Sequence, residues 1–283
     1  MGNEVDQKVK NEIERYNALF NYSGPGKIID WETYIKKREK ENKSREIFQT
    51  GLIEFDGTIY GFSPGELVVI TGLMGNGKTL FTKTLCYLLA RQKIPINIFS
   101  YEDDALQYLE AFKGETDIPL YLPDENRPGS FKWLEERIIE GRVKFNHKIA
   151  IVDHLHYIVD MASVKISQDI GVVMRRLKML AVEENMVIFI VCHQKSLPEG
   201  KSEPSLYTCR DSSAIPQECD MGLTIHRIPD LDQKGQVTDS YSGGRAILKV
   251  DKARRSGAYR KKIYLKKGQR WFTEEMSNQN HDN

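Results

Sequence analysis

The sequence predicts an α/β protein with a mostly parallel central sheet and helices on both of its faces. From residue 67 onward, short apolar runs alternate with helical stretches, as expected for parallel strands joined by helical crossovers. A glycine-rich segment at residues 72–79, GLMGNGKT, lies between the first apolar run and the first of these helices. Near the C-terminus, residues 262–271 alternate polar and apolar side chains, which predicts antiparallel strands at the end of the fold.

The composition excludes several classes of protein. The chain has 283 residues, 40% hydrophobic and 29% charged, which fits a globular protein with a sizeable core. No apolar run approaches the roughly 20 residues of a membrane span, and the N-terminus is too polar for a signal peptide. The four cysteines lack metal-binding spacing, so we expect thiols in a reducing cytoplasm, or in a host's cytoplasm for a phage or plasmid protein.

The first 47 residues are expected to form a helical linker or a subunit-docking arm. Residues 4–45 are highly charged, with apolar positions such as Ile13 and Phe20 at helical spacing. Helices of this kind are stable only when they pack on something else. We expect the main domain over residues 48–273 and a disordered tail over residues 274–283.

Residues 72–79 match the phosphate-binding pattern G-x-x-x-x-G-K-[ST], with the strand and helix that this motif requires on either side. The glycines let several backbone N–H groups point at one anion, and the following helix N-terminus adds partial positive charge. Lys78 would contact the β- and γ-phosphates, and the Thr79 hydroxyl is placed to ligate Mg²⁺. The alternative, a glycine turn that only begins a helix, does not require the full pattern. The expected contacts to ATP, or to another nucleoside triphosphate, come from Gly72, Met74, Gly75, Asn76, Gly77, Lys78, Thr79 and Leu80.

Carboxylates follow two of the predicted strands. Glu102 and Asp103 come just after the strand at residues 94–100, at the end where open α/β sheets bind ligands. Glu102 could orient the water that attacks the γ-phosphate; a solvated loop carboxylate is the alternative, and Asp103 is the second candidate for the base. Asp153 ends the apolar strand at residues 149–152, as expected of an acid that holds the Mg²⁺ shell.

A histidine follows a third strand. The strand at residues 187–191 continues into Cys192-His193-Gln194, and a polar side chain there would face the γ-phosphate and report its loss to the next loop. A structural histidine with satisfied hydrogen bonds is the alternative. The next segment, residues 195–209, has no regular period and is rich in Lys, Ser, Pro and Gly, so we expect a mobile loop.

Basic residues gather near the C-terminus although the net charge is only +1. That net charge argues against bulk attraction to nucleic acid. A surface that binds nucleic acid and a solvated strand face both fit a local basic run. A single acid, Asp251, occurs among the basic residues Arg245, Lys249, Lys252, Arg254, Arg255, Arg260, Lys261, Lys262, Lys266, Lys267 and Arg270.

Taken in order, these motifs resemble a known family. The segments TGLIEFDGTIYGFSPGEL, GLMGNGKT, FSYED, IAIVDHLHYI, IFIVCHQ, RDSSAIPQECD and KARRSG, over about residues 48–273, are similar to the helicase core of DnaB-type replicative helicases and to the helicase half of phage primase-helicases. RDSSAIPQECD is the specific stretch, because it is similar to the family's R-E-S-G-A-I-E-Q-D-A-D segment. The resemblance implies a RecA-like P-loop NTPase fold. It also implies a hexameric, ATP-dependent helicase that moves 5′→3′ on single-stranded DNA and unwinds duplex, with a primase or a helicase loader as a further partner.

The resemblance also implies residue roles. Glu102 would be the catalytic base, Asp153 the Mg²⁺ partner and His193 the γ-phosphate sensor, with Gln194 as a nearby alternative. Single-stranded DNA would be held through its phosphates by Arg210, Asp211, Ser213, Lys195 and Lys201.

The segment KARRSG is similar to the family's K-x-R fingers, which reach the nucleotide of the neighbouring subunit. Lys252 and Arg254 match the pattern, but KARRSG is one residue longer than usual, so Arg255 is an alternative to Arg254. Two other functions stay open at this point. One is a RecA- or KaiC-like ATPase, such as a recombination mediator, that does not unwind DNA. The other is a ring assembly factor that hydrolyses little nucleotide.

Overall fold

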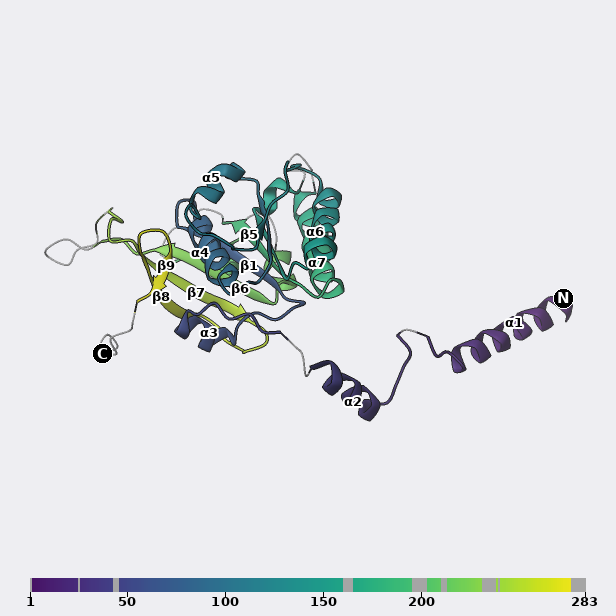
Figure 1. The fold of residues 1–283 in the computed structure, drawn as a ribbon. Coiled ribbons are helices and arrows are strands. Elements are labelled where there is room, and N and C mark those ends of the chain that lie inside the picture. Colours follow the sequence, from purple (N-terminus) through teal and green to yellow (C-terminus); the bar gives the residue numbers. More distant parts are fainter. Residues whose placement is uncertain are drawn as a thin grey trace. The chain divides into compact units, whose positions relative to one another are not determined.

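The computed structural model describes residues 2–24, 26–42, 46–159, 165–194, 203–209, 213–230, 238 and 240–275. The chain divides into two compact units, Met1–Arg45 and Glu46–Asn283 (Figure 1). The larger unit contains the sheet and its helices. None of the helices among the described residues has the length and apolar content needed to cross a bilayer.

In the smaller unit the described residues form two helices, α1 (Gly2–Phe20) and α2 (Trp31–Asn42). Large apolar side chains of α1 are mostly exposed to solvent, at 55% for Ile13 and 90% for Phe20. A helix whose apolar side chains remain exposed gains little stability from packing. A role for these helices in linking or docking subunits therefore stays a prediction.

Nine strands in the described part of the chain form one sheet, in the order β3-β2-β4-β5-β1-β6-β7-β8-β9 (Figure 1). The first six in this order pair in parallel, and β7, β8 and β9 pair antiparallel. This confirms the predicted fold class. The strands are β1 Leu67–Gly72, β2 Ile96–Ser100, β3 Leu120–Tyr121, β4 Ile149–Asp153, β5 Val187–His193, β6 Met221–Arg227, β7 Arg245–Ala253, β8 Lys261–Lys267 and β9 Phe272–Glu274.

Helices cover both faces of the sheet and enclose two hydrophobic clusters (Figure 1). Successive side chains of a strand point to opposite faces, so Val68 and Ile70 of β1 enter one cluster while Leu67 and Val69 enter the other. The first cluster includes side chains of α3 (Ile53–Ile59), α4 (Lys78–Ala90) and α5 (Ala105–Glu110). The second includes side chains of α6 (Phe131–Phe145), α7 (Ile166–Glu183) and α8 (Ala214–Glu218).

The short helix α3 has no signal in the local sequence, where Gly57 and Gly61 indicate turns. Phe55 and Ile59, one helical turn apart, are fully buried and outweigh the cost of a glycine inside the helix. Its first N–H groups are bonded by a distant acid, because the Glu274 carboxylate accepts from the backbone of Phe55 at 2.8 Å and of Glu54 at 3.1 Å. Such long-range caps satisfy helix ends that local residues leave open.

The C-terminal strands also differ from expectation. The predicted run at residues 262–271 is divided, because β8 ends at Lys267 and a tight turn follows, with the Gly268 N–H donating to the Trp271 carbonyl at 2.8 Å. The fold continues past residue 273: Glu274 belongs to β9, and the Glu275 N–H donates to the Tyr264 carbonyl at 2.8 Å. The predicted tail therefore begins too early, and its remaining residues lie outside the described part.

Candidate functional site

The predicted site residues converge at one edge of the sheet. In a parallel sheet the carboxyl ends of the strands lie together, and β2, β4, β5 and β1 are consecutive neighbours. The strand register pairs Ser100 with Asp153 and Gly72 with His193. The glycine-rich loop, Glu102, Asp153 and His193 therefore leave four adjacent strands at the same level.

The loop geometry explains its glycines. Gly75 and Gly77 have φ angles of 72° and 93°, in the left-handed region that glycine adopts without strain. A Cβ atom on Gly72 would lie 2.2 Å from the Ile225 carbonyl oxygen, so β1 and β6 can approach here only with glycine. Asn76 fixes the loop from the other side, since its Oδ1 accepts the Arg227 N–H at 2.9 Å. The loop thus has the fixed backbone that an anion site at a helix N-terminus needs.

Lys78 is buried, with 5% of its surface exposed, and it lies across the loop. Its Nζ donates to the carbonyl oxygens of Gly72 and Leu73, each at 3.1 Å. Burial lowers the pKa of Lys78, while the negative charges of Glu102 and Asp153 act in the opposite direction. An anion placed in the loop would therefore meet a desolvated cation that is held close by weak neutral acceptors.

Asp153 is 1% exposed, and neither of its carboxylate oxygens has a hydrogen-bond partner among the described residues. Burial raises its pKa to about 7, with the charge of Glu102 acting in the same direction and with Thr79 and Lys78 acting against it. A buried carboxylate with unsatisfied oxygens is costly unless a cation neutralises it. The residues present fit Mg²⁺, which Asp153 and the Thr79 hydroxyl would hold.

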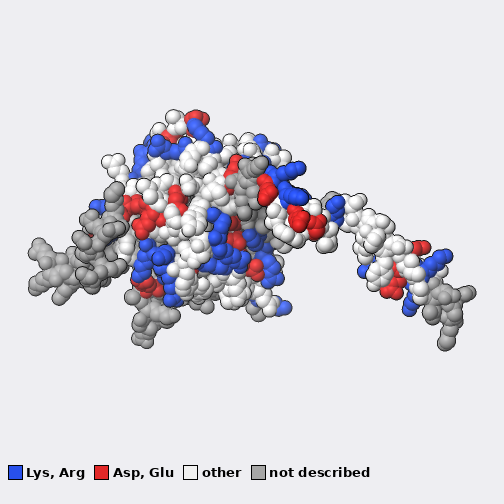
Figure 2. All heavy atoms as spheres, turned by 90° about the horizontal axis from the view of Figure 1, so that it is seen from below, with Lys and Arg blue, Asp and Glu red and all other residues white. Residues whose placement is uncertain are grey.

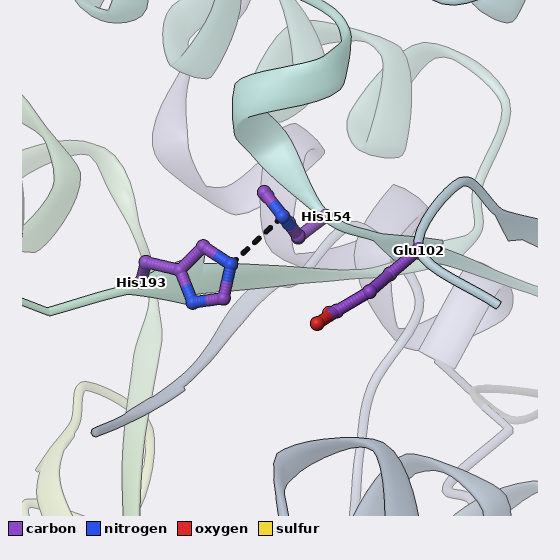
Figure 3. Close-up of side chains that lie close together, drawn as sticks. All are labelled: Glu102, His154 and His193. Atoms are coloured by element: carbon purple, nitrogen blue, oxygen red, sulfur yellow. Dashed lines mark hydrogen bonds between the residues drawn. The ribbon is translucent and has the colours of Figure 1, made fainter. Parts of the chain in front are cut away.

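The two carboxylates after β2 have different environments. Asp103 forms an ion pair with Lys83 of α4 at 2.9 Å, and both side chains are largely buried. Glu102 is exposed, and Figure 3 shows its carboxylate extended toward the rings of His154 and His193. The structure therefore favours Glu102 over Asp103 as the group that could act on a water molecule at this edge.

His154 was not identified from the sequence. Its Nε2 lies 2.8 Å from Nε2 of His193, and one ring atom of each histidine and an oxygen of Glu102 lie within 4.8 Å of one another (Figure 3). Burial lowers the pKa of His154 to about 3, and His193, His156 and Lys78 act in the same direction. The sequence did contain a signal, because His154 directly follows Asp153 at the end of a strand. When β4 and β5 pair, this position lies beside the end of β5.

Gln194 connects the end of β5 to the next described segment. Its side-chain N–H donates to the Ser205 carbonyl at 2.7 Å, and its backbone forms an isolated bridge with Cys209. Because the Gln194 side chain is hydrogen-bonded to Ser205, His193 is favoured as the side chain at the nucleotide.

Among the described residues, five of the eleven basic residues at 245–270 form ion pairs, four of them with acids that are distant in sequence. Figure 2 shows Lys and Arg in several groups, with Asp and Glu among them, on the face that it presents. This pattern weakens the interpretation of the whole run as a surface for nucleic acid. The ion pairs are Arg245 with Glu275, Lys249 with Asp251, Arg254 with Asp220, Arg255 with Glu66 and Lys262 with Glu203.

The three candidate finger residues differ in how firmly they are held. The Lys252 ammonium donates to the carbonyl oxygens of Pro216 at 2.8 Å and Cys219 at 2.7 Å. Arg255 pairs with Glu66 at 2.9 Å and donates to three carbonyl groups at the end of α3, those of Ile59, Tyr60 and Gly61.

Arg254 is the loosely held member of this group. Its side chain is 55% exposed, pairs with Asp220 at 3.5 Å and donates to the Gln217 carbonyl at 3.0 Å. The contacts of Lys252 and of Arg255 with Glu66 are partly buried, whereas both contacts of the Arg254 side chain are exposed and cost less to break.

Replacing Arg255 with alanine is expected to lower the free energy of unfolding by about 1–3 kcal/mol, because the Glu66 carboxylate and the last carbonyls of α3 lose their donor. Urea unfolding measures this difference. Arg254→Ala is the matched control, and it should change the unfolding midpoint little because its ion pair is exposed. Equal midpoints for the two variants would show that Arg255 does not cap α3.

Four of the residues expected to contact DNA, Lys195, Lys201, Arg210 and Asp211, lie outside the described residues. Ser213 is described; it is exposed and directly precedes α8. Their role in DNA binding stays a prediction.

The similarity to known proteins covers the part of the chain that contains this site. The family model described as DnaB-like helicase C terminal domain matches residues 48–117 and 104–274. The replicative DNA helicase DnaB of Treponema pallidum is 28% identical over 233 residues, which cover 71% of this chain and 52% of that protein. The replicative DNA helicase DnaB of Mycoplasma genitalium is 24% identical over 286 residues, which cover 88% and 61%. The chain thus spans between about half and three-fifths of the length of these relatives.

Two solved structures share the fold. One is described as an ATPase domain, and it superposes with a TM-score of 0.70 at 18% identity, covering 89% of this chain and all of that one. The other is a DnaB-like replicative helicase, whose structure was described with its interactions with primase, and it superposes with a TM-score of 0.68 at 16% identity. This second match covers 94% of this chain and 71% of that chain. At these identities the likeness establishes the fold alone.

Proposed function

Because the chain belongs to the family of DnaB-like helicase C-terminal domains, we propose that it is the motor domain of a replicative DNA helicase. It hydrolyses ATP, or another nucleoside triphosphate, in the cytoplasm and uses the energy to move 5′→3′ on single-stranded DNA and to unwind duplex. The observation that carries this proposal is the convergence of Lys78, Glu102, Asp153 and His193 at the ends of four adjacent strands.

Each of these residues has a role in hydrolysis. The loop backbone and Lys78 bind the β- and γ-phosphates. Because the Lys78 side chain is buried, its attraction to a phosphate is stronger than that of a lysine in water. Thr79 and Asp153 would hold Mg²⁺, which would neutralise charge on the phosphates. Glu102 orients the attacking water, and His193 contacts the γ-phosphate.

The geometry also supports a site shared between subunits. β7 runs antiparallel to β6, so Ala253 at the end of β7 pairs with Met221 at the beginning of β6. β1 runs parallel to β6, and the phosphate-binding loop follows the end of β1. Arg254 therefore lies at the opposite edge of the sheet from its own loop, separated by about the 20 Å of a six-residue strand. It can act only on the nucleotide of another copy.

This arrangement favours a closed ring. A head-to-tail contact that presents the Arg254 edge of one subunit to the loop edge of the next closes into a ring when the rotation permits, and we propose a hexamer. The α1 and α2 helices dock on the adjacent subunit. A primase or a helicase loader, as further partners, would bind the assembled ring.

Mixing two inactive variants tests the shared site. Arg254→Ala subunits keep an intact loop, and Lys78→Ala subunits keep an intact finger, so a mixed ring contains some complete sites. We expect ATPase activity to reappear on mixing and to peak at intermediate ratios. Absence of activity at every ratio, with mixed rings confirmed by native mass spectrometry, would exclude Arg254 as a finger that acts in trans.

DNA binding should rest on phosphates. The proposed contacts are Arg210, Asp211, Ser213, Lys195 and Lys201. Contacts to phosphates would make binding independent of sequence and sensitive to salt.

The decisive experiment measures the ATPase rate against added single-stranded DNA, with mass determined in the same buffer with nucleotide and Mg²⁺. A hexamer whose turnover rises several-fold, and which then unwinds a forked duplex, is the expected result. A DNA-stimulated ATPase that leaves the fork intact would instead indicate a non-unwinding member of the RecA-like class. A rate that DNA does not change would indicate an assembly factor.

A further inference from the structure

His154 lies between two hydrogen-bond partners that together determine where its proton is. Its Nδ1 accepts the backbone N–H of His156 at 3.3 Å. Its Nε2 lies 2.8 Å from Nε2 of His193. The ring is 6% exposed, and it precedes the single helical turn at Leu155–Tyr157. Both ring nitrogens of His154 therefore face a defined partner, and Figure 3 shows the one at His193.

The first contact assigns the tautomer of His154. A backbone N–H can only donate, so Nδ1 of His154 presents a lone pair. A neutral imidazole carries one proton, which must then be on Nε2. That N–H points at Nε2 of His193, which in turn must present a lone pair. The remaining ring nitrogen of His193, Nδ1, carries the proton of the neutral ring.

We propose that His154 is a positioning residue that holds His193 in the tautomer with its proton on Nδ1. His193 then presents Nδ1–H as its donor for a phosphate oxygen, while its Nε2 stays bonded to His154. Without this partner the two neutral tautomers of His193 compete, and only the one with its proton on Nδ1 presents this donor. This role rests on the proposed function of His193, whereas the tautomer itself does not.

A metal ion is the other chemical possibility for this cluster. One carboxylate and two imidazoles within 4.8 Å of one another are a donor set that Zn²⁺ accepts. Metal binding through Nε2 of His154, however, requires a lone pair on that atom while Nδ1 already uses its own to accept the His156 N–H. A neutral ring with two lone pairs and no proton does not exist, so the hydrogen-bond pattern favours the histidine pair.

Solid-state NMR of the full chain labelled with ¹⁵N-histidine tests the tautomer directly, because protonated and unprotonated ring nitrogens have well-separated shifts. We expect the proton of His193 on Nδ1 and that of His154 on Nε2. His154→Gln keeps a side-chain N–H for His193 and should preserve the His193 pattern. His154→Met keeps similar bulk without a donor and should produce a mixture of tautomers. His226→Met, in β6, is the control for removal of a histidine elsewhere.

Kinetics of the same variants test the role. His154→Met should lower kcat about tenfold with little change in the KM for ATP, and His154→Gln should recover most of it. A His193 with its proton on Nε2 in the unmodified chain would overturn the tautomer assignment, and so would stoichiometric Zn²⁺ binding that His154→Met abolishes. Correct tautomers with unchanged kcat in His154→Met would overturn the positioning role. An unmodified chain with the expected tautomers but without ATPase activity would contradict the proposed function instead, so the two failures are distinguishable.

Discussion

Lys78→Ala is expected to abolish nucleotide turnover, with a loss of at least about 10²–10³-fold in kcat. Lys78 follows the loop in sequence, and its ammonium donates to the carbonyls of Gly72 and Leu73 at the beginning of the loop. Its charge is desolvated, so the alanine variant loses an interaction that water cannot replace. A steady-state ATPase assay with saturating nucleotide measures the loss.

Lys93→Ala is the matched control for this variant. Lys93 follows the other end of α4, where its exposed side chain pairs with Asp117, so turnover should stay close to that of the unmodified chain. Thermal unfolding should show that both variants fold. Normal turnover in a folded Lys78→Ala chain would contradict the entire assignment of the phosphate-binding loop.

Glu102→Gln is expected to stall hydrolysis by about 10²–10⁴-fold while nucleotide binding persists. The amide keeps the size of the side chain but loses the charge that orients and deprotonates the attacking water. Because Glu102 is exposed at the end of β2, the substitution removes no core contact and should leave the fold intact. Single-turnover hydrolysis and equilibrium binding of a fluorescent nucleotide separate the two effects.

Asp103→Asn is the control for the neighbouring carboxylate. Asp103 is paired with Lys83, so its loss should affect the loop modestly and leave hydrolysis within a few-fold. If Glu102→Gln stays active and Asp103→Asn is inactive, the base is Asp103. The segment after β2 would then have a different orientation when nucleotide is bound.

The nucleotide site was predictable because its signals are local. A glycine loop and an acid at the end of an apolar run are each written in consecutive residues, and parallel strands bring their ends together without further information. Lys78, Glu102, Asp153 and His193 follow from this rule, and their roles stay predictions until the experiments above. The alternating order of strands and helices likewise sufficed for the fold class, which the sheet and the related structures confirm.

The features that were missed depend on contacts between distant parts of the chain. The helix α3 is stabilised by Glu274 and Arg255, some 200 positions later, so its own glycines gave a misleading signal. The ion pairs within the basic run depend on distant acids such as Glu66 and Asp220. His154 was overlooked because its partner, His193, is on the neighbouring strand rather than nearby in sequence.

The unbroken sheet also determines where movement can occur. The phosphate-binding loop and Arg254 lie at opposite edges of mostly buried strands, which are hydrogen-bonded to one another apart from a register shift at Gly222–Leu223. A close-packed body of this kind bends little, so a displacement at the nucleotide is transmitted to the far edge as a turn of the whole domain. In a ring, each subunit would then act as a stiff lever, and the step along DNA would be set by rotation at the boundaries between subunits.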